Sequence, residues 1–315
     1  MSVVSQPPSS GLIATRAAPL RRVAFPAAGQ ISILLLIAAV LGSAWVGLRP
    51  DVLLWVPVCF CIALVLALAS RSLFPTARWL LIGIEGAFLV CSLGLSLASL
   101  SYVGAAFRLP LQDLQIAALD HWLGFDWTAA AQAVDRSPML LTILDAAYST
   151  FTAQLVLTTV VLLPARRIRD IDRFFVTFIF ASLFAELASM LLPTLGPISS
   201  MAADVSFTRL PTIGRTTADI VLALRSGTLR IIDLQALDGI ISFPSLHAAV
   251  AILIPYHLRW CRPLFWPVLA LNILMFVSAV PSGNHYLADV LGGTVVAVFG
   301  IVCGGRVHGW FSRSR

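Results

Sequence analysis

The stretch Asn284–Gly305, NHYLADVLGGTVVAVFGIVCGG, joins a short polar beginning to a long run of apolar residues. The apolar run is about the length that an α-helix needs to cross a bilayer. His285 and Asp289 are four positions apart, so they lie on one face of that helix. An acid inside a membrane segment is rare and requires a partner. The stretch therefore predicts a membrane helix whose first turn carries a functional polar pair.

The composition extends this prediction to the whole chain. Of the 315 residues, 59% are hydrophobic and 11% are charged, whereas a soluble domain has about 25% charged residues. The 21 basic residues are all arginine and are scattered, so we interpret them as determinants of membrane topology and not as a nucleic-acid site. The five cysteines have neither zinc-site nor disulfide spacing, so we expect buried thiols. The fold class is therefore an all-α, polytopic membrane helical bundle.

We expect about eight transmembrane helices, some of them short enough to be tilted or re-entrant. They cover residues 31–48, 52–70, 79–103, 139–163, 174–194, 244–259, 263–281 and 287–305. The arginine-rich short loops at 165–173 and 259–262 place both chain ends inside. We expect the protein to lie in the plasma (inner) membrane.

The same pattern divides the chain into five parts. We expect a disordered cytoplasmic tail (1–30), N-terminal membrane helices (31–103), an outer amphipathic segment at the interface (104–137), a catalytic core (138–305) and a cytoplasmic tail (306–315). The second long outer segment, about 195–243, is longer than a simple connection requires.

Three distant stretches meet on the outer, periplasmic side in this topology. They are LLPTLGP at 191–197, FPSLHAAV at 243–250 and SAVPSGNHYLADVLGG at 278–293. If Asp289 accepts a hydrogen bond from one nitrogen of His285, the other nitrogen is left as a nucleophile or base. The alternative for this pair is an ordinary histidine at a helix start.

The second stretch adds a proton donor and a place for an anion. Pro244 suits a first helical position, and Ser242 suits a helix cap. The N–H groups of Ser245, Leu246 and His247 would then form an anion cradle, and His247 would protonate a leaving oxygen. An ordinary Pro/Ser helix start is the alternative.

Together, PSLH and HYLAD resemble the second and third motifs of the type 2 phosphatidic acid phosphatase superfamily, P-S-x-H and S-R-x5-H-x3-D. The resemblance implies a helical membrane enzyme that acts on phosphate esters through a phosphohistidine, without metal or cofactor. It implies that His285 is the nucleophile, Asp289 its orienting partner and His247 the general acid. Ser245 and Ser278 match the phosphate-binding serines.

The chain departs from the phosphatase pattern at two places. Position 279 is alanine where the third motif has arginine, and no K-x6-R-P motif is present. PTLGP, with Pro193 and Gly196, is instead similar to the P-T-x-G-P of the inositolphosphotransferase branch, which includes inositol phosphorylceramide synthases. LDHWLGFDW and PMLLTILDAAYST are also similar to that branch.

Few fixed cations suit a phosphodiester, which carries one charge where a phosphomonoester carries nearly two. We expect Asp145 and Tyr148 to bind an acceptor hydroxyl or brace the site, and Arg215, Arg225 and Arg230 to fold over it. The predicted function is transfer or hydrolysis of a lipid phosphate, with an alcohol as a further partner and no nucleic acid. The alternatives are a phosphatidic acid or polyprenyl pyrophosphate phosphatase, and a non-enzymatic transporter or scaffold.

Overall fold

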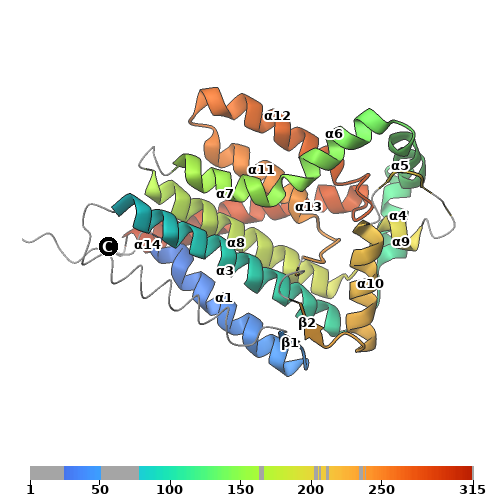
Figure 1. Ribbon diagram of the computed structural model, residues 1–315, viewed down its shortest axis with the longest axis horizontal. Coiled ribbons are helices and arrows are strands. Elements are labelled where there is room, and N and C mark those ends of the chain that lie inside the picture. Colours follow the sequence, from blue (N-terminus) through green and yellow to red (C-terminus); the bar gives the residue numbers. More distant parts are fainter. Residues whose placement is uncertain are drawn as a thin grey trace, which may run out of the picture.

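The computed structural model describes residues 25–50, 78–162, 167–201, 205, 207–210, 213–233, 237 and 239–313. Its helices run side by side along the longest axis of the molecule (Figure 1). The elongated bundle consists of α1 (Pro26–Trp45), α3 (Arg78–Ala106), α6 (Pro138–Ser149), α7 (Phe151–Leu162), α8 (Ile168–Leu191), α11 (Leu246–Leu258), α12 (Arg262–Ser278), α13 (Leu287–Phe299), η2 (Gly300–Gly304) and α14 (Gly305–Arg313).

The remaining elements gather at one end of the bundle, opposite α14 and the C-terminus (Figure 1). We call this group the cap. It consists of α4 (Asp113–Trp122), α5 (Trp127–Asp135), α9 (Pro197–Ser200), α10 (Ile213–Ser226) and the short parallel pair β1 (Arg49–Pro50) and β2 (Ile231–Ile232).

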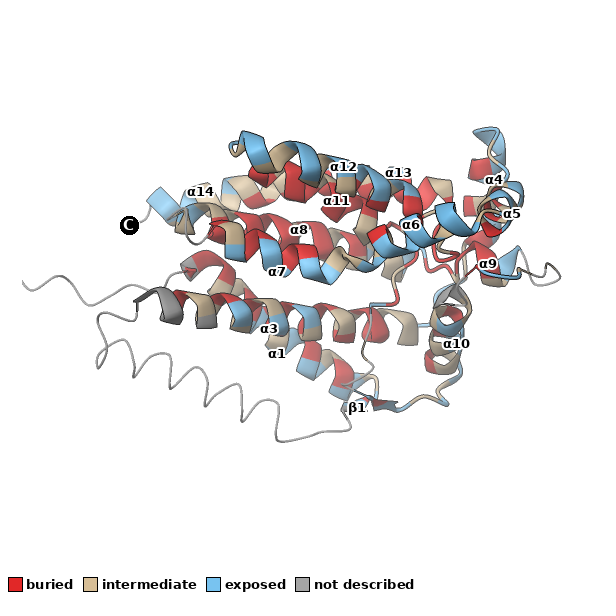
Figure 2. Ribbon diagram, turned by 45° about the horizontal axis from the view of Figure 1, so that its top comes forward, coloured by how far each residue is buried: buried red, intermediate tan, exposed pale blue. Residues whose placement is uncertain are grey.

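The centre of the bundle is α8, which packs against α1, α3, α7, α11 and α13. Its Phe174, Phe175 and Ile179 are almost fully buried in the main apolar cluster. In Figure 2 the buried positions concentrate on α8, α11 and α13, while α1, α6 and α12 show exposed outer faces. Many of these exposed side chains are large and apolar, such as Leu34 (65%) and Trp266 (65%). Such a surface suits a lipid surrounding.

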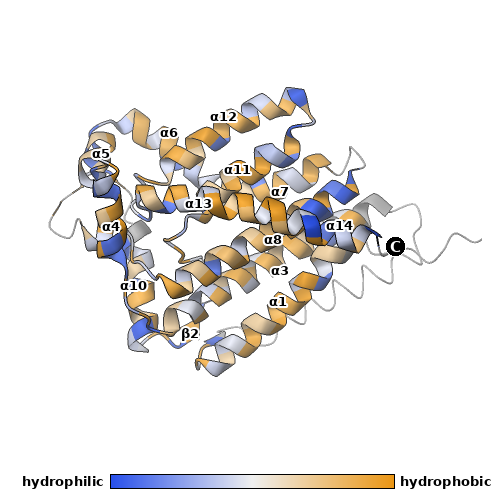
Figure 3. Ribbon diagram, turned by 180° about the vertical axis from the view of Figure 1, so that it is seen from behind, coloured by the Kyte–Doolittle hydropathy of each residue, from blue (hydrophilic) through white to orange (hydrophobic). Residues whose placement is uncertain are grey.

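The helices are apolar along most of their lengths, and α14 is the most polar stretch at the far end (Figure 3). Among the described residues, four helices are long and apolar enough to cross a membrane, and the bent pair α6–α7 would make a fifth. The fold is thus the expected all-α membrane bundle, and α11 and α12 are shorter apolar helices.

Several expected boundaries differ from the observed ones. Helix α1 begins at Pro26, inside the expected tail, and α14 extends through most of the expected C-terminal tail. The expected span at 52–70 and the rest of the N-terminal tail lie outside the described residues.

The single span expected at 139–163 is instead two helices, bent by 52°. At the break, Thr150 donates its hydroxyl to the carbonyl of Ala147 (2.6 Å), a back-bond that bends helices. The bend is accompanied by packing of α6 against α12. This contact forms one side of the candidate site.

Candidate active site

The ring of His285 is held by a backbone carbonyl. Its Nδ1 lies 2.8 Å from the carbonyl oxygen of Ser242, and the residue is 1% exposed. A carbonyl oxygen can only accept, so Nδ1 carries the proton and donates it. The lone pair is therefore on Nε2, the form that a nucleophilic histidine needs.

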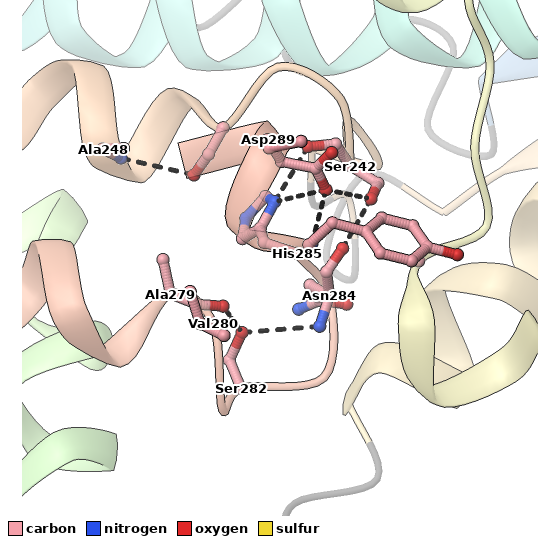
Figure 4. Close-up of polar contacts among 12 residues, drawn as sticks. Ser242, Ala248, Ala279, Val280, Ser282, Asn284, His285 and Asp289 are labelled. Carbon is pink, nitrogen blue, oxygen red and sulfur yellow. Dashed lines mark hydrogen bonds and ion pairs between the residues drawn. The ribbon is translucent and has the colours of Figure 1, made fainter. Parts of the chain in front are cut away.

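Asp289 does not accept the predicted hydrogen bond from the imidazole of His285. Its Oδ2 is 3.7 Å from Nδ1 of His285, which is an ion-pair distance and too long for a hydrogen bond. The same oxygen accepts hydrogen bonds from the N–H of Tyr286 (2.8 Å) and the hydroxyl of Ser242 (3.1 Å). Asp289 thus orients the segment around His285, while Ser242 fixes the tautomer (Figure 4).

The start of α11 is built differently from the prediction. The N-cap residue of α11 is Ser245 and not Ser242. The Ser245 hydroxyl accepts a hydrogen bond from the N–H of Ala248 (3.3 Å). Pro244 therefore lies before the helix and not at its first position. The Ser245 N–H donates to the carbonyl of Asp289 (2.9 Å), so it is not free for an anion. Leu246 and His247 begin the helix, so their N–H groups have no intrahelical acceptor and remain the candidate cradle.

His247 lies beside His285 and is enclosed by aromatic rings. The two imidazole centroids are 6.0 Å apart. Tyr148 stacks on His247 with a centroid separation of 3.9 Å, and Phe151 packs on it at 4.5 Å. Residues of α6, α7, α11 and the turn before α13 therefore meet at one place, which brings His247 of PSLH next to His285 of HYLAD.

A pocket opens next to these rings, between α6 and α12. Its lining is Leu141, Leu144, Asp145, Tyr148, Ser278, Pro281 and Ser282. Of the predicted acceptor residues, both Asp145 and Tyr148 are present. Ser278 is also in the wall, but its hydroxyl donates to the carbonyl of Met275 (2.8 Å), so a phosphate contact would require that bond to break. Ala279, where the phosphatase motif has arginine, is fully buried beside Ala248 and Val290.

The PTLGP loop supports the site through its backbone. Gly196 has φ +90°, and a Cβ there would lie 2.7 Å from the carbonyl oxygen of Asn284. Pro193 accepts a hydrogen bond from the N–H of Gln112 (2.8 Å). These contacts place the loop directly against the residues that precede His285, as scaffold for that turn.

The three arginines expected to fold over the site have other contacts. Arg215 reaches the carbonyl of Val205 (3.5 Å), and Arg230 donates to the carbonyl of Val46 (3.0 Å) at the end of α1. Arg225 has its pKa lowered by burial and by the nearby charge of Arg108. None of them lines the pocket between α6 and α12.

Sequence reasoning missed four residues that hold the site together. Asp113 and Asp120 of α4 accept hydrogen bonds from the PTLGP loop and from the start of α13. Trp127 donates to the carbonyl of Val280 (2.9 Å), and Asn284 donates weakly to the hydroxyl of Tyr148 (3.4 Å). One signal was available for the acids: their spacing of seven places both on one face of a helix.

One of three comparisons with known proteins found a match. The sequence model of the PAP2 superfamily matches residues 114–303, more than half of the chain. The chain belongs to the PAP2 superfamily. No curated protein and no solved structure matches it. PAP2 membership indicates a phosphatase- or phosphotransferase-type activity in a multi-pass membrane protein. The PAP2 match begins inside α4, so it includes the two cap helices that the sequence placed outside the core.

Proposed function

We propose that this PAP2 protein transfers the phospho-group of a lipid through a phosphohistidine at His285. The observation that carries the proposal is the bond from Nδ1 of His285 to the carbonyl of Ser242, at 2.8 Å. It leaves Nε2 with the lone pair that attacks phosphorus. The closeness of His247, with 6.0 Å between ring centroids, supports it as the partner for proton transfer.

The reaction has two steps. First, Nε2 of His285 bonds to phosphorus while the bond from phosphorus to the leaving oxygen breaks, and His247 gives that oxygen its proton. Next, His247 takes the proton of an alcohol or water, whose oxygen bonds to phosphorus as the Nε2–phosphorus bond breaks. The N–H groups of Leu246 and His247 face the phosphoryl oxygens at the positive end of α11.

Transfer to an alcohol, as in the inositolphosphotransferase branch, is favoured by the pocket. Its wall combines apolar residues with Asp145, a hydrogen-bond acceptor for a hydroxyl, and has neither lysine nor arginine. A wall without cations suits a diester with one charge better than a monoester with nearly two. The site faces the outer side in this proposal.

The test uses the purified chain in lipid nanodiscs with a glycerophospholipid labelled at phosphorus, with and without candidate lipid alcohols such as a ceramide. We expect a labelled protein adduct that is lost in acid and stable in base, and a new labelled lipid when the acceptor is present. His285→Ala should abolish both, and the control His121→Ala should not, because His121 is an exposed residue of α4.

Each outcome selects one function. Release of inorganic phosphate alone, whichever alcohol is added, would show the lipid phosphatase instead. Full turnover by His285→Ala would reject the nucleophile. Absence of any turnover or adduct with every glycerophospholipid and polyprenyl phosphate tried would support the transporter or scaffold alternative.

A further inference from the structure

Helix α4 buries two carboxylates and exposes large apolar side chains, the opposite of what a surface helix in water does with these residue types. Asp113 and Asp120 are buried, at 7% and 2% exposure, while Leu114 and Trp122 are exposed, at 84% and 79%. Burying two carboxylates is costly unless each accepts hydrogen bonds. The hydrogen-bond donors to these two carboxylates therefore identify the segments that α4 holds in place.

Asp120 caps the helix that follows the proposed nucleophile. Its Oδ2 accepts from the N–H of Leu287 (2.9 Å) and its Oδ1 from the N–H of Ala288 (2.7 Å). These are the first two residues of α13, whose N–H groups have no intrahelical acceptor. A carboxylate here also meets the positive end of the helix dipole. Burial raises the pKa of Asp120, and the two N–H groups oppose this rise.

Asp113, two turns earlier, holds the opposite side of the same turn. Its carboxylate accepts from the N–H groups of Leu195 (3.0 Å) and Gly196 (3.1 Å) and from the hydroxyl of Tyr286 (3.0 Å). Tyr286 is fully buried and directly follows His285. The Gly196 backbone in turn packs on the carbonyl of Asn284, which directly precedes His285.

The two carboxylates thus fix the residues on both sides of His285 from a separate helix of the cap. We propose that Asp113 and Asp120 are positioning residues for His285, so that α4 sets the place and direction of the nucleophilic ring. The inference rests on the proposed function. It assigns neither acid to contact with substrate.

A matched control is available in Asp135, the last residue of α5. It is also 7% exposed and accepts hydrogen bonds from Thr208 (2.9 Å), Arg209 (2.7 Å) and Leu210 (2.6 Å). Although burial opposes its charge, these bonds lower the pKa of Asp135 to about 2. Asp135 therefore holds a cap loop, as Asp120 holds α13, and its side-chain hydrogen bonds to described residues go to 208–210 and not to the turn of His285.

The experiment compares Asp120→Ala, Asp120→Asn, Asp113→Asn and Asp135→Ala in nanodiscs, with the folded fraction measured for each. Rapid mixing with phosphorus-labelled glycerophospholipid gives the rate of phosphohistidine formation, and steady-state assays give kcat and KM. We expect Asp120→Ala to lower the formation rate and kcat by about 10- to 100-fold with little change in KM, as a displaced reacting group does. The two asparagine variants keep one acceptor oxygen and should lose less.

Asp135→Ala should lower thermal stability but leave kcat per folded molecule within about twofold of the unaltered protein, because its lost bonds hold only the cap loop. If Asp120→Ala does not fold, the two asparagine variants decide. Unchanged phosphohistidine formation in the folded Asp120 and Asp113 variants would overturn the proposal. So would an equal loss of kcat in Asp135→Ala.

His285→Ala is included in the same assay to separate the two proposals. If it retains turnover, the proposed function fails whatever the α4 variants do. If it is inactive while the α4 variants form phosphohistidine at the normal rate, the proposed function stands and only the positioning role is rejected.

Discussion

At the scale of single residues, the tautomer of His285 depends on a backbone atom. The Ser242 carbonyl remains in any substitution at that position, whereas the Ser242 hydroxyl can be removed. That hydroxyl donates its one proton to the carbonyl of Asn284 at 2.5 Å and shares it with Oδ2 of Asp289 at 3.1 Å. Asp289 Oδ1 has no hydrogen-bond partner among the described residues, so each donor to Oδ2 matters for this buried carboxylate.

Ser242→Ala should therefore lower the free energy of unfolding by about 1–3 kcal/mol and leave the reaction slower but present, because the Nδ1 contact survives. Chemical denaturation in detergent and the phospholipid assay measure the two effects. Ser96→Ala is the control, since Ser96 is equally buried and its hydroxyl donates only to its own helix, at Ser92 (2.7 Å). Complete loss of turnover in Ser242→Ala would contradict this division of roles.

Gly196 gives a second residue-level prediction. Gly196→Ala places a Cβ 2.7 Å from the Asn284 carbonyl, so the turn that carries His285 must shift. Left-handed backbone at an alanine costs about 1–3 kcal/mol by itself. We expect that loss of stability together with a fall in kcat of about tenfold or more, since the reacting ring is displaced.

Gly124→Ala separates these two effects. Gly124 has a similar φ of +74°, but a Cβ there has nothing within 4 Å. It should cost stability without changing kcat. Equal kcat values in the two alanine variants would show that the contact with Asn284 does not position His285.

At the scale of elements, the sequence predicts most of the bundle and about half of the site. Apolar runs locate α3, α8 and α13, and the motifs PSLH and HYLAD bring His247 and His285 together. The break between α6 and α7 was missed because it lies inside a continuous apolar run, where hydropathy does not distinguish one bent span from one straight span.

The role of α4 was missed for another reason. When only their own segment is considered, Asp113 and Asp120 fit a solvent-exposed helix face as well as a buried one. Their burial follows from N–H groups that lie at positions 195–196 and 287–288. Such pairings depend on how distant loops pack, and a local pattern carries no information on them.

The packing of α11 against α13 sets the separation of His247 and His285. It depends on Gly293, where a Cβ would lie 2.4 Å from the carbonyl oxygen of Ser245 and 2.7 Å from Cβ of Ala248. Backbone atoms of a helix start cannot turn aside as a flexible side chain does. Any side chain at 293 therefore moves one helix away from the other.

Gly293→Ala should lower kcat by about 10- to 100-fold, because proton transfer from His247 requires its close approach to the leaving oxygen. Gly94→Ala in α3 is the control: its Cβ meets nothing within 4 Å, and helical alanine stabilises by about 0.5–1 kcal/mol relative to glycine. Both are measured in the labelled-lipid assay and by thermal unfolding. A fully active Gly293→Ala protein would show that the helices tolerate the extra separation.

At the scale of the whole molecule, the two ends of the bundle differ in chemistry. The cap end holds the candidate site and helix α4, whose exposed Leu114 and Trp122 suit the boundary between lipid and water. The other end holds α14 and the arginines near it, such as Arg173 and Arg306. Arginines gather on the cytoplasmic side of membrane proteins, so the cap should face outward.

Single cysteines at the two ends test this orientation. In a background with the five native cysteines replaced by serine or alanine, Gln115→Cys lies on the exposed side of α4 and Ser312→Cys on the exposed side of α14. A membrane-impermeant maleimide added to intact cells should label position 115 at once and position 312 only after permeabilisation. The reverse pattern would place the histidine site inside, where the substrate would have to be a lipid of the inner leaflet.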